Sequence, residues 1–352
     1  MSVLKLIPAY KDYLWGGTRL KEKYNKDTDI TPCAESWELS MHEDGPSHVG
    51  YLKLSESVNE EMLGKNVSLL GEFPMLIKLI DAKENLSVQV HPSDAYAKSR
   101  ENSLGKTEMW YIVDADEGAG IYLGFERDIT REEMTEAIRT NTLTQLLHFY
   151  PVKPGECYFI PAGTVHAIGA GCLICEIQQS SNLTYRVYDY GRVGADGKPR
   201  ELHIEKALEV ASLKKHEIRT LPDSILGISK YFTVRKHTVS GRLTVTMDKS
   251  SFKSFTVVRG SGAVNGIRAS LGSSFFIGAD EESFTLTGDM DVIMTELRRY
   301  SVRTALSAVG CTATLVDDLG CEIASCKAAD AASSRRTLLS SLYLTEGDID
   351  IF

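Results

Sequence analysis

The sequence has few features that would place the chain on a membrane or on nucleic acid. Its 352 residues contain no apolar run long enough to cross a bilayer, and the start, Met1-Ser-Val-Leu-Lys5, lacks the basic-then-apolar pattern of a secretory signal. Acidic residues outnumber basic ones, and the formal net charge is −9. A negatively charged chain is not attracted to phosphodiester backbones or anionic lipids. We therefore expect no nucleic-acid partner, no membrane association and a cytoplasmic location.

Two residue types are sparse in informative ways. The seven cysteines are odd in number and scattered, which is typical of reduced thiols in the cytoplasm. Cys172 and Cys175 have metal-site spacing, but a strand would direct their thiols to opposite faces, and no second such pair exists. We interpret them as core residues. None of the eight histidines lies beyond His237, so a histidine-based metal site is excluded from the C-terminal third.

The most informative segment lies between residues 155 and 170. An apolar stretch follows Gly155 and ends in the turn Pro161-Ala-Gly163, and His166 comes three residues later. This turn chemistry predicts a hairpin that holds His166 at a fixed position at the start of the next strand.

Upstream residues supply further candidate metal ligands. Gln89 and His91 are two residues apart, so on a strand their side chains would lie on the same face. Glu108, between these residues and His166, supplies a carboxylate. We predict that strands of one sheet system bring the four side chains together around one divalent metal ion. Two imidazoles and a carboxylate suit Zn²⁺, with Mn²⁺, Co²⁺ or Fe²⁺ as alternatives.

These motifs resemble the cupin superfamily, whose second motif is G-x5-P-x-G-x2-H-x3-N. The match includes Gly155, Pro161, Gly163 and His166, with Ala170 where Asn is usual. The first cupin motif departs from the pattern, because Gln89 replaces a histidine and residues 92–105 form a polar insertion. Together with the segments 13–20, 35–38 and 182–186, these features resemble the type I mannose-6-phosphate isomerases in their short bacterial form. The resemblance spans about residues 3–300.

The resemblance implies a mainly β fold with two cupin jelly-roll (double-stranded β-helix) domains and a small helical insertion. We expect a catalytic, metal-binding domain over residues 1–215, with the insertion at about 128–149. A second, metal-free domain is expected over residues 216–300. Its segment 272–283 is a faded copy of 155–166, with Ser283 where the metal-binding histidine stands. The pattern at 111–123 predicts a hairpin. Residues 301–352 form a C-terminal extension of unknown structure and role, in which a helix is expected within residues 328–344.

The resemblance also implies a function: reversible, metal-dependent isomerisation of mannose 6-phosphate and fructose 6-phosphate in carbohydrate metabolism and mannose activation. The reaction would pass through an enediol(ate), whose charge Arg186 would stabilise. Either Glu176 or Lys106 would transfer the proton, and Ser87 and Arg192 would hold the phosphate. The alternatives are a non-catalytic sugar-phosphate-binding cupin and a metal-dependent cupin oxygenase. Gln89 and the cationic residues disfavour the oxygenase. The sequence leaves open the proton-transferring group, ligation by Gln89, the metal's identity and the choice between monomer and homodimer.

Overall fold

The computed structural model describes residues 2–193, 197–218, 221–222, 225–307 and 310–349. Contacts divide the chain into two compact units. The first unit comprises residues 8–48 and 75–218, and the second comprises residues 1–7, 49–74 and 219–352. The predicted catalytic domain, residues 1–215, is thus not one continuous segment. Residues 1–7 belong to the second unit because β1 (Val3–Lys5) pairs with β19 (Ser274–Ile277), a long-range pairing that no local pattern reveals.

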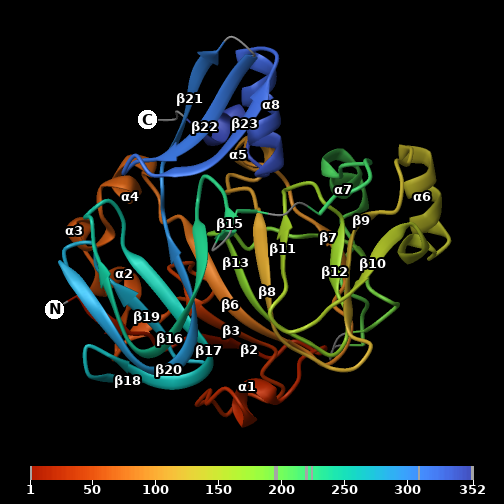
Figure 1. Ribbon diagram of the computed structural model, residues 1–352. Helices are drawn as coiled ribbons and strands as arrows, with labels where there is room; N and C mark the ends of the chain where they lie inside the picture. Colours follow the sequence, from red (N-terminus) through yellow and green to blue (C-terminus); the bar gives the residue numbers. More distant parts are fainter. Residues whose placement is uncertain (1, 194–196, 219–220, 223–224, 308–309, 350–352) are drawn as a thin grey trace. The chain divides into compact units, whose positions relative to one another are not determined.

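The first unit is built from two β-sheets (Figure 1). The six-stranded sheet has the order β11-β8-β13-β6-β3-β2, and the five-stranded sheet has the order β10-β9-β12-β7-β14. An apolar core includes side chains from both sheets, among them Trp110 and Ile174 from the first and Ile121 and Ile168 from the second. The predicted mainly β cupin fold is therefore confirmed. The strands are β2 (Ala9–Lys11), β3 (Glu35–Leu39), β6 (Met75–Ala82), β7 (Val88–Val90), β8 (Glu108–Ala115), β9 (Gly120–Phe125), β10 (Leu147–Pro151), β11 (Cys157–Ile160), β12 (His166–Ile168), β13 (Cys172–Gln179) and β14 (Tyr185–Tyr188).

The prediction of a hairpin at residues 111–123 is wrong, because the two strands there do not pair with each other. β8 pairs with β11 and β13, whereas β9 pairs with β10 and β12. Because β8 is hydrogen-bonded on both sides, it has no free edge for β9. The Asp/Gly turn between them therefore carries the chain from one sheet to the other.

Helices of the first unit lie in the connections between strands: α1 (Arg19–Glu22), α5 (Asp94–Arg100), α6 (Arg131–Arg139), the 3₁₀ helix η1 (Leu143–Gln145) and α7 (Ile204–Val210). α6 begins at a capping box, in which the Thr130 hydroxyl accepts the Glu133 N–H and the Glu133 carboxylate accepts the Thr130 N–H. Its buried Met134 and Ile138 pack in a second core cluster. The predicted insertion, 128–149, is helical only to residue 145, because β10 begins at Leu147.

The second unit contains a seven-stranded sheet with the order β1-β19-β17-β20-β16-β15, and β18 pairs with β17. Its interior is apolar and rich in phenylalanine, including Phe255, Phe275 and Phe284. The faded copy is confirmed, since β19 and the start of β20 at Ser283 repeat the spacing of β11 and His166. The further elements are α2 (Leu54–Ser57), α3 (Glu60–Leu63), α4 (Lys65–Leu70), β15 (Ile225–Ile228), β16 (Thr233–Thr246), β17 (Lys253–Val264), β18 (Ile267–Ser270) and β20 (Ser283–Glu296); β4 (His48–Val49) and β5 (Leu52–Lys53) form a short ribbon.

Residues 300–349 of this unit, hereafter the C-terminal module, form a separate three-stranded sheet and a helix. The sheet has the order β21 (Tyr300–Ser307), β22 (Gly310–Asp317) and β23 (Glu322–Ala328). The helix α8 (Ala331–Ser341) lies within the predicted range 328–344, and the 3₁₀ helix η2 (Glu346–Asp348) follows it. Leu338 and Leu339 of α8 pack with Ala313 and Leu315 of β22 in a small apolar core. No helix in the described ranges is long and apolar enough to cross a membrane.

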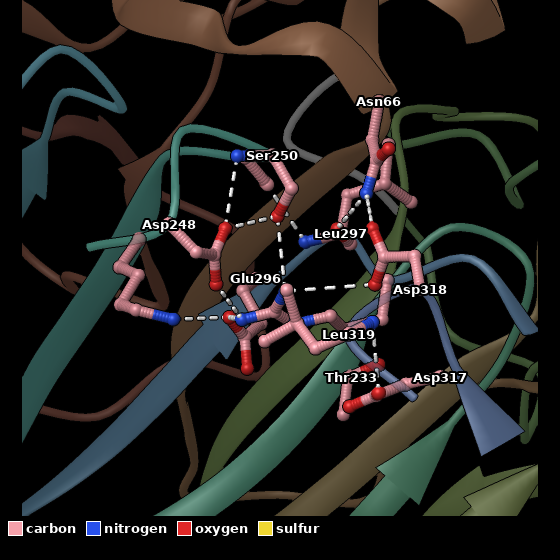
Figure 2. Close-up of polar contacts among 12 residues, drawn as sticks. Asn66, Thr233, Asp248, Ser250, Glu296, Leu297, Asp317, Asp318 and Leu319 are labelled. Atoms are coloured by element: carbon pink, nitrogen blue, oxygen red, sulfur yellow. Dashed lines mark hydrogen bonds and ion pairs between the residues drawn. The ribbon is translucent and has the colours of Figure 1, made fainter. Parts of the chain in front are cut away.

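A buried polar network joins the C-terminal module to the cupin sheet (Figure 2). The Arg298 guanidinium lies 2.5 Å from Asp248 and 2.7 Å from Glu296, and it donates a hydrogen bond of 2.9 Å to the Ser250 hydroxyl. It also lies 3.5 Å from Asp318 of the module. The Asn66 amide of α4 donates to both Asp318 and the Leu297 carbonyl. One arginine therefore holds together segments that are far apart in the sequence.

We predict that Arg298→Met lowers the free energy of unfolding by about 1–3 kcal/mol, because it leaves the partly buried Asp248 and Asp318 without this cation, whereas Glu296 keeps Lys253. Chemical denaturation measures the change. The matched control is Arg259→Met, which removes a half-exposed arginine that pairs with Asp289 and Asp291. It should change stability little, because Asp289 is exposed and the buried Asp291 keeps its ion pair with Lys236. Equal losses in the two variants would contradict the importance of the buried network.

Candidate active site

A cavity of about 280 Å³ opens within the first unit. Side chains from both of its sheets line the wall. Five predicted site residues are among them: Ser87, Gln89, Lys106, Glu176 and Arg186.

The predicted metal ligands meet beside this cavity. His91 Nε2 lies 3.2 Å from Glu108 Oε1, and His166 Nε2 lies 3.5 Å from Glu108 Oε2. One ligand atom from each of the three residues lies within 4.8 Å of the others. The sequence predicts these ligands on strands of one sheet system, but the structure brings them from two different sheets. Glu108 begins β8 in the six-stranded sheet, whereas His166 begins β12 and His91 directly follows β7 in the five-stranded sheet.

Backbone carbonyls fix the orientation of both imidazoles. His91 Nδ1 lies 2.9 Å from the Leu183 carbonyl, and His166 Nδ1 lies 2.8 Å from the Thr164 carbonyl. A carbonyl only accepts hydrogen bonds, so Nδ1 carries the proton in each ring and Nε2 keeps its lone pair. Gly163, in the left-handed region with φ of 88°, donates its N–H to the His91 carbonyl at 2.8 Å. The Pro-x-Gly turn is thereby tied to the other histidine segment.

The charges of this cluster are those that a metal site requires. Burial lowers the pKa of His91 to about 3, an effect to which the Lys106 ammonium adds. Burial also lowers the pKa of His166, so both imidazoles are neutral. Burial opposes ionisation of Glu108, but the Lys106 ammonium holds the pKa of this carboxyl well below its usual range. Metal ligands must be deprotonated in this way.

Glu108 provides a direct test of whether these residues fit a metal ion. Its side chain is fully buried, and neither carboxylate oxygen has a hydrogen-bond partner among the described residues, although Oε1 forms an ion pair with Lys106. Buried carboxylate oxygens are costly unless paired or coordinated. With two imidazole lone pairs facing the same carboxylate, the donor set fits a divalent cation.

Gln89 lies beside this trio. In the antiparallel pair of β7 and β12, Gln89 lies opposite His166, and its side-chain amide nitrogen lies 3.4 Å from His166 Nε2. A half-turn of the amide would present its oxygen, the only atom of the group that ligates a metal. The structure thus places Gln89 next to the predicted ligands.

A second buried charged cluster adjoins the cavity. Trp110 Nε1 donates to Glu176 Oε1 at 2.8 Å, and Lys78 Nζ lies 3.5 Å from both Glu176 Oε2 and Glu35 Oε2. Burial, with a contribution from the Glu108 charge, raises the pKa of Glu176 to about 7. Burial alone would lower the pKa of Lys78, but Glu35 and Glu176 raise it. Sequence reasoning missed Lys78, although a single lysine in the apolar run 73–80 was a usable signal.

Cationic groups line another part of the cavity. Arg186 Nε donates to the Ser87 hydroxyl at 3.2 Å, and burial lowers the pKa of this arginine, with a contribution from the nearby Arg200. Arg200 and His203, which were not predicted, also line the cavity. The Arg186 N–H donates to His203 Nδ1 at 3.3 Å, which leaves the proton on His203 Nε2 as a further donor.

Arg192, by contrast, is not among the lining residues. Its guanidinium donates to the Asn85 carbonyl and to Asp189, and it lies over the Tyr190 ring. Asp189 also accepts two hydrogen bonds from Arg200, at 2.7 and 2.5 Å. The structure thus places Arg192, which was predicted to hold the phosphate, outside the cavity lining: the connection after β14 brings Arg200 there, and Arg192 holds Asp189.

Comparison with known proteins identifies the family. Residues 3–121 match the catalytic domain of type I phosphomannose isomerases, and residues 224–297 match the mannose-6-phosphate isomerase cupin domain. ManA of Bacillus subtilis, a mannose-6-phosphate isomerase, is 38% identical over 72% of this chain and 85% of its own length. The chain belongs to the type I phosphomannose isomerase family.

Two further comparisons support this family assignment. The mannose-6-phosphate isomerase of Streptococcus mutans is 39% identical over 65% of this chain and 76% of its own length. The crystal structure of the Bacillus subtilis mannose 6-phosphate isomerase superposes with a TM-score of 0.74 at 33% identity, covering 84% of this chain and 99% of that chain. The family assignment made from the sequence is thus confirmed, and the chain is an isomerase of this family.

We predict that the purified protein carries about one equivalent of divalent metal, held by His91, Glu108 and His166, and that His166→Ala loses it because one of three ligands is gone. Elemental analysis measures the content. His148→Ala is the matched control, since His148 is partly exposed and pairs with Glu126. Full metal content in His166→Ala would refute the assignment.

Proposed function

We propose that this enzyme interconverts mannose 6-phosphate and fructose 6-phosphate through an enediol(ate), with a divalent metal, Zn²⁺ in our expectation, as its cofactor. The observation that carries the proposal is the composition of one cavity. Glu176, a buried carboxylate with a raised pKa, lines it together with Arg186 and Arg200, and the His-Glu-His trio lies directly behind its lining residues Gln89 and Lys106. His91, Glu108 and His166 would hold the metal, with Gln89 as a further ligand. When bound, the cation acts as a Lewis acid toward the carbonyl and hydroxyl oxygens of the sugar.

The chain's own residues supply the proton transfer between C2 and C1. Glu176 is our candidate base, because burial has raised its pKa toward neutrality, where a general base is most effective. Trp110 fixes its Oε1, which leaves Oε2 for the substrate proton, with Lys78 3.5 Å away. Lys106 is engaged in an ion pair with Glu108 and lies 3.3 Å from His91 Nε2. We therefore assign Lys106 to the binding of substrate oxygens rather than to proton abstraction.

Arg186 takes the role of stabilising negative charge. Its guanidinium is oriented by Ser87 and by the Glu201 carbonyl, to which Nη1 donates at 3.1 Å. Because these contacts exist before any charge develops on the sugar, little reorganisation is needed during the reaction. We assign the phosphate to Ser87 and Arg200, with Arg192 fixing Asp189 behind Arg200.

A coupled assay for fructose 6-phosphate formed from mannose 6-phosphate tests the proposal. We expect turnover that is lost after metal removal with a chelator and restored by added metal ion. Binding of the sugar phosphate without turnover would instead support the non-catalytic cupin. Full activity in a chelator-treated, metal-free sample would refute metal dependence.

The same assay distinguishes Glu176 from Lys106. A carboxylate base works when ionised, so kcat/KM should rise with pH through an apparent pKa no higher than about 7, since a nearby bound cation lowers this pKa further. Glu176→Gln should lose at least about 10²-fold in kcat, the low end of a general base's contribution. If Glu176→Gln retains wild-type kcat, Lys106 becomes the base.

The phosphate assignment predicts a difference between substrates. A charge-assisted hydrogen bond contributes about 1.5–3 kcal/mol, so Arg200→Ala should raise KM for mannose 6-phosphate about 10- to 100-fold. The neutral donor lost in Ser87→Ala should cost less, about 0.5–1.5 kcal/mol. Activity on unphosphorylated mannose should hardly change. Arg192→Ala is the comparison: a phosphate ligand would affect only the phosphorylated sugar, whereas a residue that supports the loop would affect both.

A further inference from the structure

The C-terminal module lies outside the part of the chain that the family shares. The match to the family's cupin domain ends at residue 297, before β21 begins at Tyr300. The superposition with the Bacillus subtilis structure includes 99% of that chain but only 84% of this one. The shared isomerase chemistry therefore does not require the module. We propose that β21 is a dimerisation edge, through which two copies of this chain pair their modules into one six-stranded sheet.

β21 is an unprotected edge strand. The order β21-β22-β23 gives it a neighbour on one side only. Its ladder with β22 is regular, from the Tyr300–Asp317 pair to the Ser307–Gly310 pair. Within the described residues, no backbone hydrogen bond joins 301–306 to any segment other than β22.

The other edge of the module is different. The ladder of β23 shifts register between Leu315 and Val316 of β22, and β23 carries Glu322 and Lys327. Bulges and charged residues are the usual means by which a protein blocks the pairing of a strand with another chain. β21 has no proline and no register shift, and its only charged residue is Arg303. The contrast indicates that β21 is the edge left open for a partner.

The side chains of β21 fit a second copy of the same strand. Val302, Thr304 and Leu306 face Leu315, Ala313 and Cys311 of β22, all three of which are buried, so they lie on the core side of the sheet. Leu306 is nevertheless 85% exposed. An antiparallel pair centred on Thr304 places Leu306 opposite the partner's Val302. This exposed leucine would then lie beside an apolar side chain of the other copy.

Charge selects this register over its neighbours. In an antiparallel pair, opposed residues lie on the same face of the sheet. The two-fold axis that relates two copies of β21 must therefore pass beside a residue, hereafter the centre, and not between two residues. A centre at Arg303 would oppose two arginines, which is destabilising. A centre at Ala305 would shorten the pair and oppose Leu306 with the partner's Thr304. With the centre at Thr304, Arg303 faces the partner's Ala305 and no like charges meet.

Light scattering coupled to size-exclusion chromatography of the full-length protein tests the proposal. We expect the wild type to have twice the mass of one chain, and Leu306→Lys and Thr304→Pro to have the mass of one. Ser325→Lys, a change at an exposed position of β23, should remain dimeric. All four proteins should retain isomerase activity, which shows that they are folded. A monomeric wild type, or a dimer unaffected by Leu306→Lys, would overturn the proposal.

Cross-linking tests the register. In a background with the exposed Cys321 replaced by serine, Thr304→Cys should form a disulfide-linked dimer under mild oxidation, because opposed residues lie about 4.5–5.5 Å apart. Arg303→Cys should not, because its symmetry mate would be offset along the strand beyond the roughly 7 Å limit of a disulfide. Efficient linkage through position 303 and not 304 would refute the pairing centred on Thr304. This outcome is independent of whether the proposed isomerase activity is correct.

Discussion

The site depends on the burial of one carboxylate. Glu108 is fully enclosed, and neither of its oxygens accepts a hydrogen bond from a described residue. Removing a charge from water costs several kcal/mol unless other charges compensate. Here the compensation comes from Lys106 and from the cation that two imidazole lone pairs and this carboxylate would hold in common. The fold serves this requirement, because the first residue of β8 and the first residue of β12 meet from different sheets.

Local charge, rather than overall charge, sets what the cavity binds. The chain carries a net charge of −9, yet Lys106, Arg186 and Arg200 all line one cavity. Exposed charges are screened beyond about 8–10 Å at physiological ionic strength, whereas partly buried groups that line a pocket are screened less. A sugar phosphate inside the pocket therefore experiences these cations more than the distant surface carboxylates. The buried Lys78 balances Glu35 and Glu176 in the same way, so that both of these buried carboxylates have a cation nearby.

Turn motifs and strand spacing in the sequence predicted those site residues whose positions depend on nearby residues in the chain. The Pro161–Gly163 turn fixed the place of His166, and strand spacing placed Gln89 and His91 beside it. Long-range pairing was beyond such patterns: β1 joins the second unit through β19, and β8 and β9 belong to different sheets although a turn connects them. Loop register was equally inaccessible. The family resemblance pointed to Arg192, but the chain turns so that Arg200 lines the cavity and both arginines share Asp189.

The second unit shows how the cupin frame is filled where no histidine stands at the position of His166. Ser283 occupies the position of His166 and is exposed, while the interior is filled by stacked Phe255, Phe275 and Phe284. This phenylalanine cluster gains apolar burial and contains no charged side chain to compensate. The first unit instead encloses carboxylates, imidazoles and lysines in the same kind of frame. Because that arrangement stabilises a fold less than well-packed apolar side chains do, chemistry rather than stability accounts for the polar interior of the first unit.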